Sequence, residues 1–258
     1  MSVSAAPGEL DFTACGSLDR HDRGSCVPGE GCGTTAVVIS PINPLLLLTL
    51  IVALPNNMSG ATEKYFPKAI RGDVLNTTRI LVWNLGSSAA TVTTQFFDQT
   101  GEQLESRISL LEGNGSEEIT LGGPTVEQII DNNLLTVGWV KVTSDQDVLA
   151  TAFYTLQFGD TSVPPVGVLP VSLSDWWSGV GEKSSTSDTA IALANPGVGR
   201  AECELTAHQA DGDTAGSAII QLGPGEQTAQ FLGQLIPELG IPFQGCLNCT
   251  ATRARSPP

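Results

Sequence analysis

Histidine is the residue type that most often supplies acid–base or nucleophilic chemistry, and the chain contains two. His21 lies in a leader rich in Gly, Ser and Asp, so a Ser/His/Asp or Cys/His arrangement would depend on His208 alone. His208 precedes an expected turn at Asp211-Gly212, where a solvated side chain is the simpler interpretation. His208, Asp211 and Asp213 could form a metal site at this turn, but the spacing differs from calcium loops. We therefore predict no catalytic residue, no cofactor and no metal site.

The six cysteines fall into two groups of three, one near each end of the chain. Cys246-Leu-Asn-Cys249 has the CxxC form, but a zinc site would need a second pair, and residues three apart on a strand face opposite sides. In an internal repeat described below, Cys203 and Cys249 align with the inward-facing Val92 and Val142. This alignment suggests a buried Cys203–Cys249 disulfide between core faces; the alternative is that these thiols stay free.

The adjacent pair Trp176-Trp177 is the main candidate for ligand binding. Two glycines follow it, which predicts a loop between strands. Paired tryptophans on a loop can stack on sugar rings or anchor a protein partner. The alternative is that they close one end of a folded unit or the seam between two units. Trp139, on an expected strand, is a candidate for that seam.

The elements that would position these residues occur twice. Thr78–Gly86 and Thr189–Gly197 are each a strand-like run ending in a turn, and the second follows the first at an offset of 111 positions. Turn glycines and apolar positions coincide at the same offset: Asn84 with Asn195, Gly101 with Gly212, Ile108 with Ile219 and Leu121 with Leu232. The offset then falls by four, so that Gly138 aligns with Gly245. The pattern predicts a duplicated all-β unit.

The two copies are expected at 62–157 and 166–258, with a linker at 158–165. The first copy ends in a predicted strand within Asp145–Tyr154 that has no counterpart in the second. A sandwich without its last strand exposes an unpaired edge, where another chain can pair. Two explanations stay open: a truncated or frame-shifted product, or completion of the second module by a strand from elsewhere.

Four motifs carry a family resemblance: the Thr-x-Ile-x-Leu-x-Asn-Pro-Gly run at 189–197, the Asp-Gly turn at 211–212, Leu-Gly-Pro-Gly-Glu-Gln-Thr-Ala at 222–229 and Phe243-Gln244-Gly245. They resemble the repeated Ig-like modules of secreted or surface bacterial proteins, over about residues 62–251. The first copy departs from the pattern, with Leu85 where the motif has Pro. The resemblance implies two tandem Ig-like β-sandwiches, used as spacers, adhesion units or appendages to enzymes.

The N-terminal part has a different character. Residues 1–35 are expected to be a disordered leader, and residues 36–61 a signal peptide or a membrane anchor. The dense apolar part, Leu45–Leu54, is about as long as a signal-peptide core and shorter than the roughly 20 residues of a spanning helix. A buried hydrophobic segment is the third alternative. We expect a secreted or cell-surface protein, with a possible anchor at 36–54.

Charge excludes one class of partner. The 258-residue chain has 27 acidic and 12 basic side chains, for a formal net charge of −15, which repels nucleic acid. The sequence thus favours a non-catalytic, extracellular structural or adhesion-type repeat protein. The alternative is an accessory carbohydrate-binding module that uses Trp176 and Trp177. Expected partners are a protein or glycan at the cell surface, or a strand at the open edge of the second module.

Overall fold

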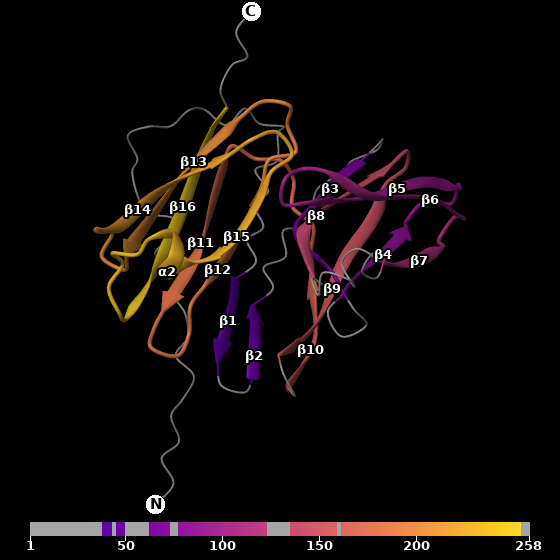
Figure 1. Cartoon of the computed structure of the whole chain (residues 1–258). Helices are drawn as coiled ribbons and strands as arrows, with labels where there is room; N and C mark the ends of the chain where they lie inside the picture. Colours follow the sequence, from indigo (N-terminus) through magenta and orange to yellow (C-terminus); the bar gives the residue numbers. More distant parts are fainter. Residues whose placement is uncertain are drawn as a thin grey trace, which may run out of the picture.

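A computed structural model describes residues 38–42, 45–49, 62–72, 77–122, 135–158 and 161–253. This part of the chain is all-β, built from antiparallel strands with one short helix (Figure 1). The predicted leader at 1–35 lies outside the described residues. The elements are β1 (Val38–Ile42), β2 (Leu45–Thr49), β3 (Thr62–Arg71), β4 (Thr77–Asn84), β5 (Ala90–Asp98), β6 (Gln103–Leu111), β7 (Ser116–Thr120), β8 (Thr136–Ser144), β9 (Val148–Phe158), β10 (Thr161–Val168), β11 (Trp176–Lys183), β12 (Ala190–Ala194), β13 (Ala201–Gln209), β14 (Thr214–Leu222), β15 (Gln227–Phe231), α2 (Leu232–Leu235) and β16 (Phe243–Arg253).

Strands β3 to β10 form a first assembly. Its eight-stranded sheet has the order β10-β9-β4-β3-β8-β5-β6, and β7 pairs with the other side of β4. β3 and β4 pair only at Arg71–Thr77, whereas every other neighbouring pair is longer. Buried residues from both halves of the sheet, among them Phe66 and Ile80, form one hydrophobic cluster. The halves therefore enclose a common core, an arrangement consistent with a β-sandwich.

The alternation along β5 shows why this sequence is a strand. Ala90, Val92, Thr94 and Phe96 are buried, and the residues between them are exposed or half-buried. This is the period of two that the sequence predicted for these positions. Burying a side chain such as Val92 or Phe96 contributes about 1.5–3 kcal/mol, so the alternation determines which face of β5 meets the core.

Strands β11 to β16, with β1 and β2, form a second assembly. It has two four-stranded sheets, β11-β16-β13-β14 and β15-β12-β1-β2. A second hydrophobic cluster includes Ile191 of β12, Leu205 of β13 and Leu247 of β16, and Leu232 of α2 packs into it. The two clusters share no residue, so each assembly has its own core.

A buried asparagine occupies the same position in both assemblies. The Asn84 amide nitrogen donates to the carbonyl oxygens of Ser88, Leu111 and Glu112 at 2.7, 3.2 and 3.0 Å. The same nitrogen of Asn195 donates to the carbonyls 111 positions further on, those of Gly199, Leu222 and Gly223, at 2.7, 3.2 and 2.9 Å. Each Oδ1 accepts from the glycine two residues later, Gly86 at 2.9 Å and Gly197 at 3.1 Å. The offset predicted from the sequence thus holds at atomic detail.

A glycine allows close strand packing at a second repeated position. A Cβ on Gly138 of β8 would lie 1.9 Å from the carbonyl oxygen of Phe97, and one on Gly245 of β16 would lie 1.9 Å from that of His208. Both carbonyls follow a register shift, in β5 and β13 respectively. The irregularity pushes a backbone oxygen toward the neighbouring strand, and only glycine leaves room for it.

Two boundaries differ from the sequence-based expectation. Thr161–Val168, mostly within the predicted linker, is β10, which pairs with β9 and places Val168 in the first core. The second assembly therefore begins after Val168, and its strand β11 takes the place of β3. The hydrogen bond from the Ile70 N–H to Thr78 Oγ1 recurs as that from the Glu182 N–H to Thr189 Oγ1, at 2.7 and 2.8 Å. The two prolines of β10 obscured the strand pattern, because proline usually breaks a ladder.

The segment predicted as a signal peptide or anchor contains β1 and β2. They pair with one another over five residues each and extend the sheet of the second assembly at β12. The remaining residues of 36–61 lie outside the described part of the chain. Among the described residues there is no helix of sufficient length and apolar character to cross a membrane. Export itself stays a prediction.

Replacing either buried asparagine with alanine should destabilise its assembly. Asn84→Ala and Asn195→Ala each remove three hydrogen bonds donated by the amide nitrogen and one accepted by its oxygen, so we expect a loss of about 3 kcal/mol in each case. Urea unfolding followed by tryptophan fluorescence measures it. Ser88→Ala is the control, because Asn84 binds the Ser88 backbone only. Losses below about 1 kcal/mol in both asparagine variants would contradict this role.

Adding a methyl group at the close-packed glycines should be equally costly. Gly138→Ala and Gly245→Ala force adjacent strands apart, and we expect each to lower stability by about 3 kcal/mol. Thermal unfolding monitored by circular dichroism measures the change. Gly240→Ala is the matched control, since a Cβ there meets no atom within 4 Å, and it should stay within about 0.5 kcal/mol of the parent chain.

Candidate functional site

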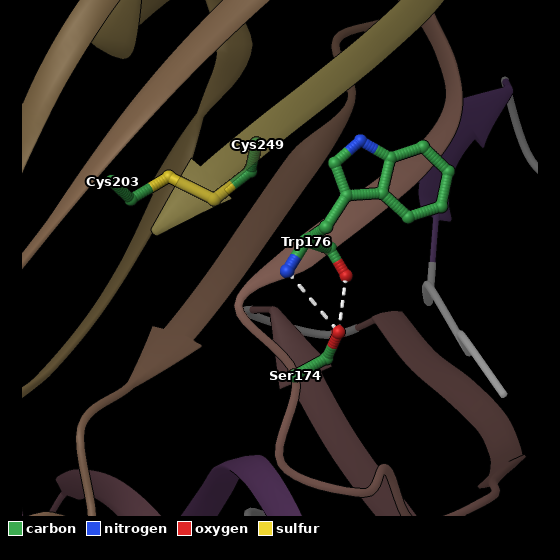
Figure 2. Close-up of a disulfide and its surroundings, with 4 residues drawn as sticks. All are labelled: Ser174, Trp176, Cys203 and Cys249. Atoms are coloured by element: carbon green, nitrogen blue, oxygen red, sulfur yellow. Dashed lines mark hydrogen bonds between the residues drawn. A yellow bond between two sulfur atoms is a disulfide. The ribbon is translucent and has the colours of Figure 1, made fainter. Parts of the chain in front are cut away.

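The tryptophans singled out from the sequence lie on a strand. Trp176 and Trp177 begin β11, opposite Thr250 and Cys249 of β16. Because successive strand residues face opposite sides, Trp177 packs against the second core while Trp176 is 52 % exposed. The Trp176 backbone is held by Ser174, whose Oγ accepts from its N–H and donates to its carbonyl (Figure 2). The two rings therefore do not form one binding platform.

The glycines after the tryptophans explain why the strand was predicted as a loop. Gly179 and Gly181 indicate a turn in the sequence, but the structure uses Gly181 for close packing. A Cβ on Gly181 would lie 2.7 Å from Cδ1 of Leu247, a fully buried residue of the second core. The glycine lets β11 lie flat over this leucine, so its role comes from a contact that is distant in sequence.

Cys203 and Cys249 are joined by a disulfide (Figure 2). Cys249 lies opposite Leu205, two residues from Cys203, so the two cysteines are diagonal neighbours on β13 and β16, with Cα atoms 5.8 Å apart. Both are buried in the second core. The bond therefore connects adjacent strands of one sheet, rather than spanning the two core faces as the sequence hypothesis had it.

His208 lies near the end of β13, at the register shift before the turn. Its Nδ1 is buried without a hydrogen-bond partner in the described structure. Asp211 accepts the N–H of Asp213 at 3.1 Å, which stabilises the turn itself. Among all the residues that the structure describes, no three His, Cys, Asp or Glu side chains lie close enough together to bind a metal ion.

Hydrogen bonds and an aromatic stack join the two assemblies where they meet. Trp139 of β8 is almost fully buried, and its Nε1–H donates to the carbonyl of Gly225, between β14 and β15, at 2.8 Å. Its ring is stacked on Phe97, with centroids 4.2 Å apart and planes 10° apart. The ring of Tyr65 is the second aromatic neighbour of Trp139, with 6.4 Å between the two ring centroids. The prediction that Trp139 lies at the seam is confirmed.

Gln227, the first residue of β15, makes two further bonds across this contact. Its N–H donates to the carbonyl of Gln99 at 3.1 Å, and its side-chain amide donates to that of Pro67 at 3.0 Å. Beside it, Gly101 and Gly225 both have positive φ, and a Cβ on Gly101 would lie 2.8 Å from Gly225 Cα. Two turns thus touch backbone to backbone, which only glycine permits here.

Charged groups surround Tyr65 at the edge of the contact. The Tyr65 hydroxyl donates to the Glu63 carboxylate, and the Lys141 amine forms an ion pair with the same group at 2.5 Å. Hydrogen bonds from Lys141 and Tyr65 lower the pKa of Glu63. Burial, and then the neighbouring Glu63, raise the pKa of Tyr65. At neutral pH the tyrosine is therefore a neutral donor and the glutamate a charged acceptor.

The corresponding turn of the first assembly is closed differently. Asn114 occupies the place of Gly225, also at positive φ, and its carbonyl accepts the Nε1–H of Trp83 at 3.2 Å. The residue 111 positions after Trp83 is Ala194, which has no such donor. The Gly225 carbonyl is consequently open to Trp139. This substitution, together with the Gly-Pro-Gly turn at 223–225, is the sequence signal by which the acceptor side could have been found.

No family model matches the chain, and no curated protein matches it either. The interpretation of these sites therefore depends on their geometry.

Removing one hydrogen bond should loosen the contact without dismantling it. Trp139→Phe keeps a ring against Phe97 but loses the bond to Gly225, so we expect about 1 kcal/mol lower stability and greater freedom between the assemblies. Residual dipolar couplings measure their relative orientation. Trp83→Phe is the matched control: it loses the equivalent bond inside the first assembly and should leave the orientation unchanged. An unchanged orientation in Trp139→Phe would contradict the proposed locking role.

Proposed function

We propose that the chain is a non-catalytic structural or adhesion-type protein that works outside the cell, built from two tandem Ig-like modules held in a fixed relative orientation. The observation that carries the proposal is the contact around Trp139. An element that sets a distance or presents a surface must resist bending at its joints. Here the joint has three directional hydrogen bonds, from Trp139 and Gln227, and a glycine-to-glycine contact.

The polar groups of both modules also support a structural role. The buried amides of Asn84 and Asn195 satisfy backbone carbonyls, and the indole N–H groups of Trp83 and Trp139 do the same. Each of these side chains has its donors occupied by the fold. Residues that bind or transform a ligand need free donors or acceptors in a concave site, and these residues stabilise turns.

Two observations support an exterior location. The Cys203–Cys249 disulfide is a bond that persists in oxidising compartments. Charged residues make up 15 % of the chain, below the roughly 25 % of average domains, so uncharged polar residues cover much of its surface.

Carbohydrate binding is the second candidate, and one observation favours it. Trp176 is half-exposed, and so is Leu173, three residues earlier in the chain, so apolar side-chain surface is available there for a sugar ring. Since Trp177 faces the core, such binding would depend on Trp176 alone.

Binding and activity assays on the full chain separate these functions. For a structural protein we expect no signal on a glycan array and no hydrolytic activity, and protease treatment of intact cells should remove the protein. Trp176→Ala should then leave the glycan-array and hydrolysis results unchanged. The control Trp83→Ala should also leave them unchanged, although it weakens a turn of the first assembly. Glycan binding that disappears in Trp176→Ala would replace the structural function with the second candidate. Hydrolysis that disappears in His208→Ala would contradict both.

A further inference from the structure

Strand β12 is paired very differently on its two sides. On one side, all five of its residues, Ala190–Ala194, pair with β15. On the other side, β1 pairs with it at one position, Ile39 opposite Ala190. Within the described residues, the backbone of Ile191–Ala194 therefore has no ladder partner on the β1 side.

The first assembly shows what normally covers this side. β4 and β7 are the counterparts of β12 and β15 at the offset of 111. The free side of β4 is covered by β9, which pairs with it along all eight residues of Thr77–Asn84, and β10 lies beyond β9. The sheet order β7-β4-β9-β10 thus corresponds to β15-β12-β1-β2, and β1 is antiparallel to β12 as β9 is to β4.

The hairpin β1–β2 therefore takes the place of β9–β10 in the second assembly. It comes from the part of the chain before the first assembly, whereas β9–β10 directly follow the strand β8 of their own assembly. Figure 1 shows β1 and β2 between the two assemblies. A strand from elsewhere in the chain thus lies in the place of β9, next to β12, and pairs with it at one position.

The composition of β12 suits a strand that is covered on both sides. Its sequence, Ala-Ile-Ala-Leu-Ala, has no charge and no proline. Strands at a solvent edge are normally protected by charged residues, proline or a bulge, because an unprotected edge pairs with other chains. β12 has none of these features, so an apolar strand beside it is the expected arrangement.

The hairpin that occupies this place pairs mainly with itself. β1 and β2 pair over all five residues of each strand. β1 also contains Pro41, which has no N–H to give to a neighbouring strand. A hairpin that pairs internally and meets β12 at one residue can leave without breaking a long ladder.

We propose that the edge of β12 is a docking site for an extended, uncharged, apolar strand running antiparallel to it, and that the hairpin β1–β2 of the same chain is its exchangeable occupant. The hairpin uses the pairing at Ala190, and a longer strand would add main-chain hydrogen bonds along Ile191–Ala194, where the small alanine side chains allow close approach. The proposal goes beyond the structural function, because strand docking on β12 needs neither the Trp139 indole nor its hydrogen bond to Gly225.

Hydrogen exchange of the full chain, read by mass spectrometry, tests the proposal. Ile39→Pro disturbs the hairpin at the residue opposite Ala190, and we expect amide exchange at the Ala190 end of β12 to become at least tenfold faster while β4 is unchanged. A synthetic peptide with the β9 sequence, Val148–Phe158, should then slow exchange there and along Ile191–Ala194, because β9 pairs with all eight residues of β4. A scrambled peptide of the same composition should have no effect.

Two glycine variants distinguish a local loss of pairing from general unfolding caused by proline. Ile39→Gly should accelerate exchange of β12, whereas Ile42→Gly, at the far end of β1, should do so less. The proposal is overturned if neither Ile39 variant alters β12, or if β12 of the parent chain already exchanges as fast as an unstructured peptide. Protection that falls on dilution, with a dimer in native mass spectrometry, would also overturn it, because the occupant would then belong to a second copy.

Discussion

The whole architecture depends on two buried carboxamide groups. Asn84 and Asn195 end the strands β4 and β12, and each side chain binds backbone groups of two turns that are distant in sequence. A buried carbonyl without a donor is costly, so the amide that satisfies three of them determines how these turns close. Once the turns are closed, the strands on either side are in register, and the apolar residues of β5 and β13 face their cores.

The contact between the assemblies builds on this arrangement. The turn containing Gly225 is one of the turns adjoining Asn195, since the Gly225 N–H donates to the Asn195 carbonyl at 2.8 Å. Because this turn is held there, the Gly225 carbonyl lies within hydrogen-bonding distance of the Trp139 indole. A local hydrogen-bond pattern at a strand end is thereby linked to the relative orientation of two separate cores.

Local repetition could be predicted from the sequence, whereas long-range pairing could not. The offset of 111 gave the asparagines, the turn glycines and the core positions, because these depend on neighbours within each copy. Trp139 was placed at the seam because both faces of its strand are apolar. The role of Gly181 depends on Leu247, the strand β10 contains two prolines, and the place of β1 depends on a vacancy far along the chain. The periodicity of a segment does not indicate which distant residues it contacts. For this reason the sequence predicts a loop at β11 and a linker over most of β10.

The unequal closure of the two turns gives the pair of assemblies a polarity. The first copy carries an indole at Trp83 and closes its own turn, so that turn needs no donor from another copy. The second copy has Ala194 at this position, and its turn takes its donor from Trp139 of the copy that precedes it. The order of the two copies along the polypeptide is thus encoded at two positions, those of Trp83 and Trp139, and reversing it would leave the Gly225 carbonyl without its indole donor and the Trp139 indole without its acceptor.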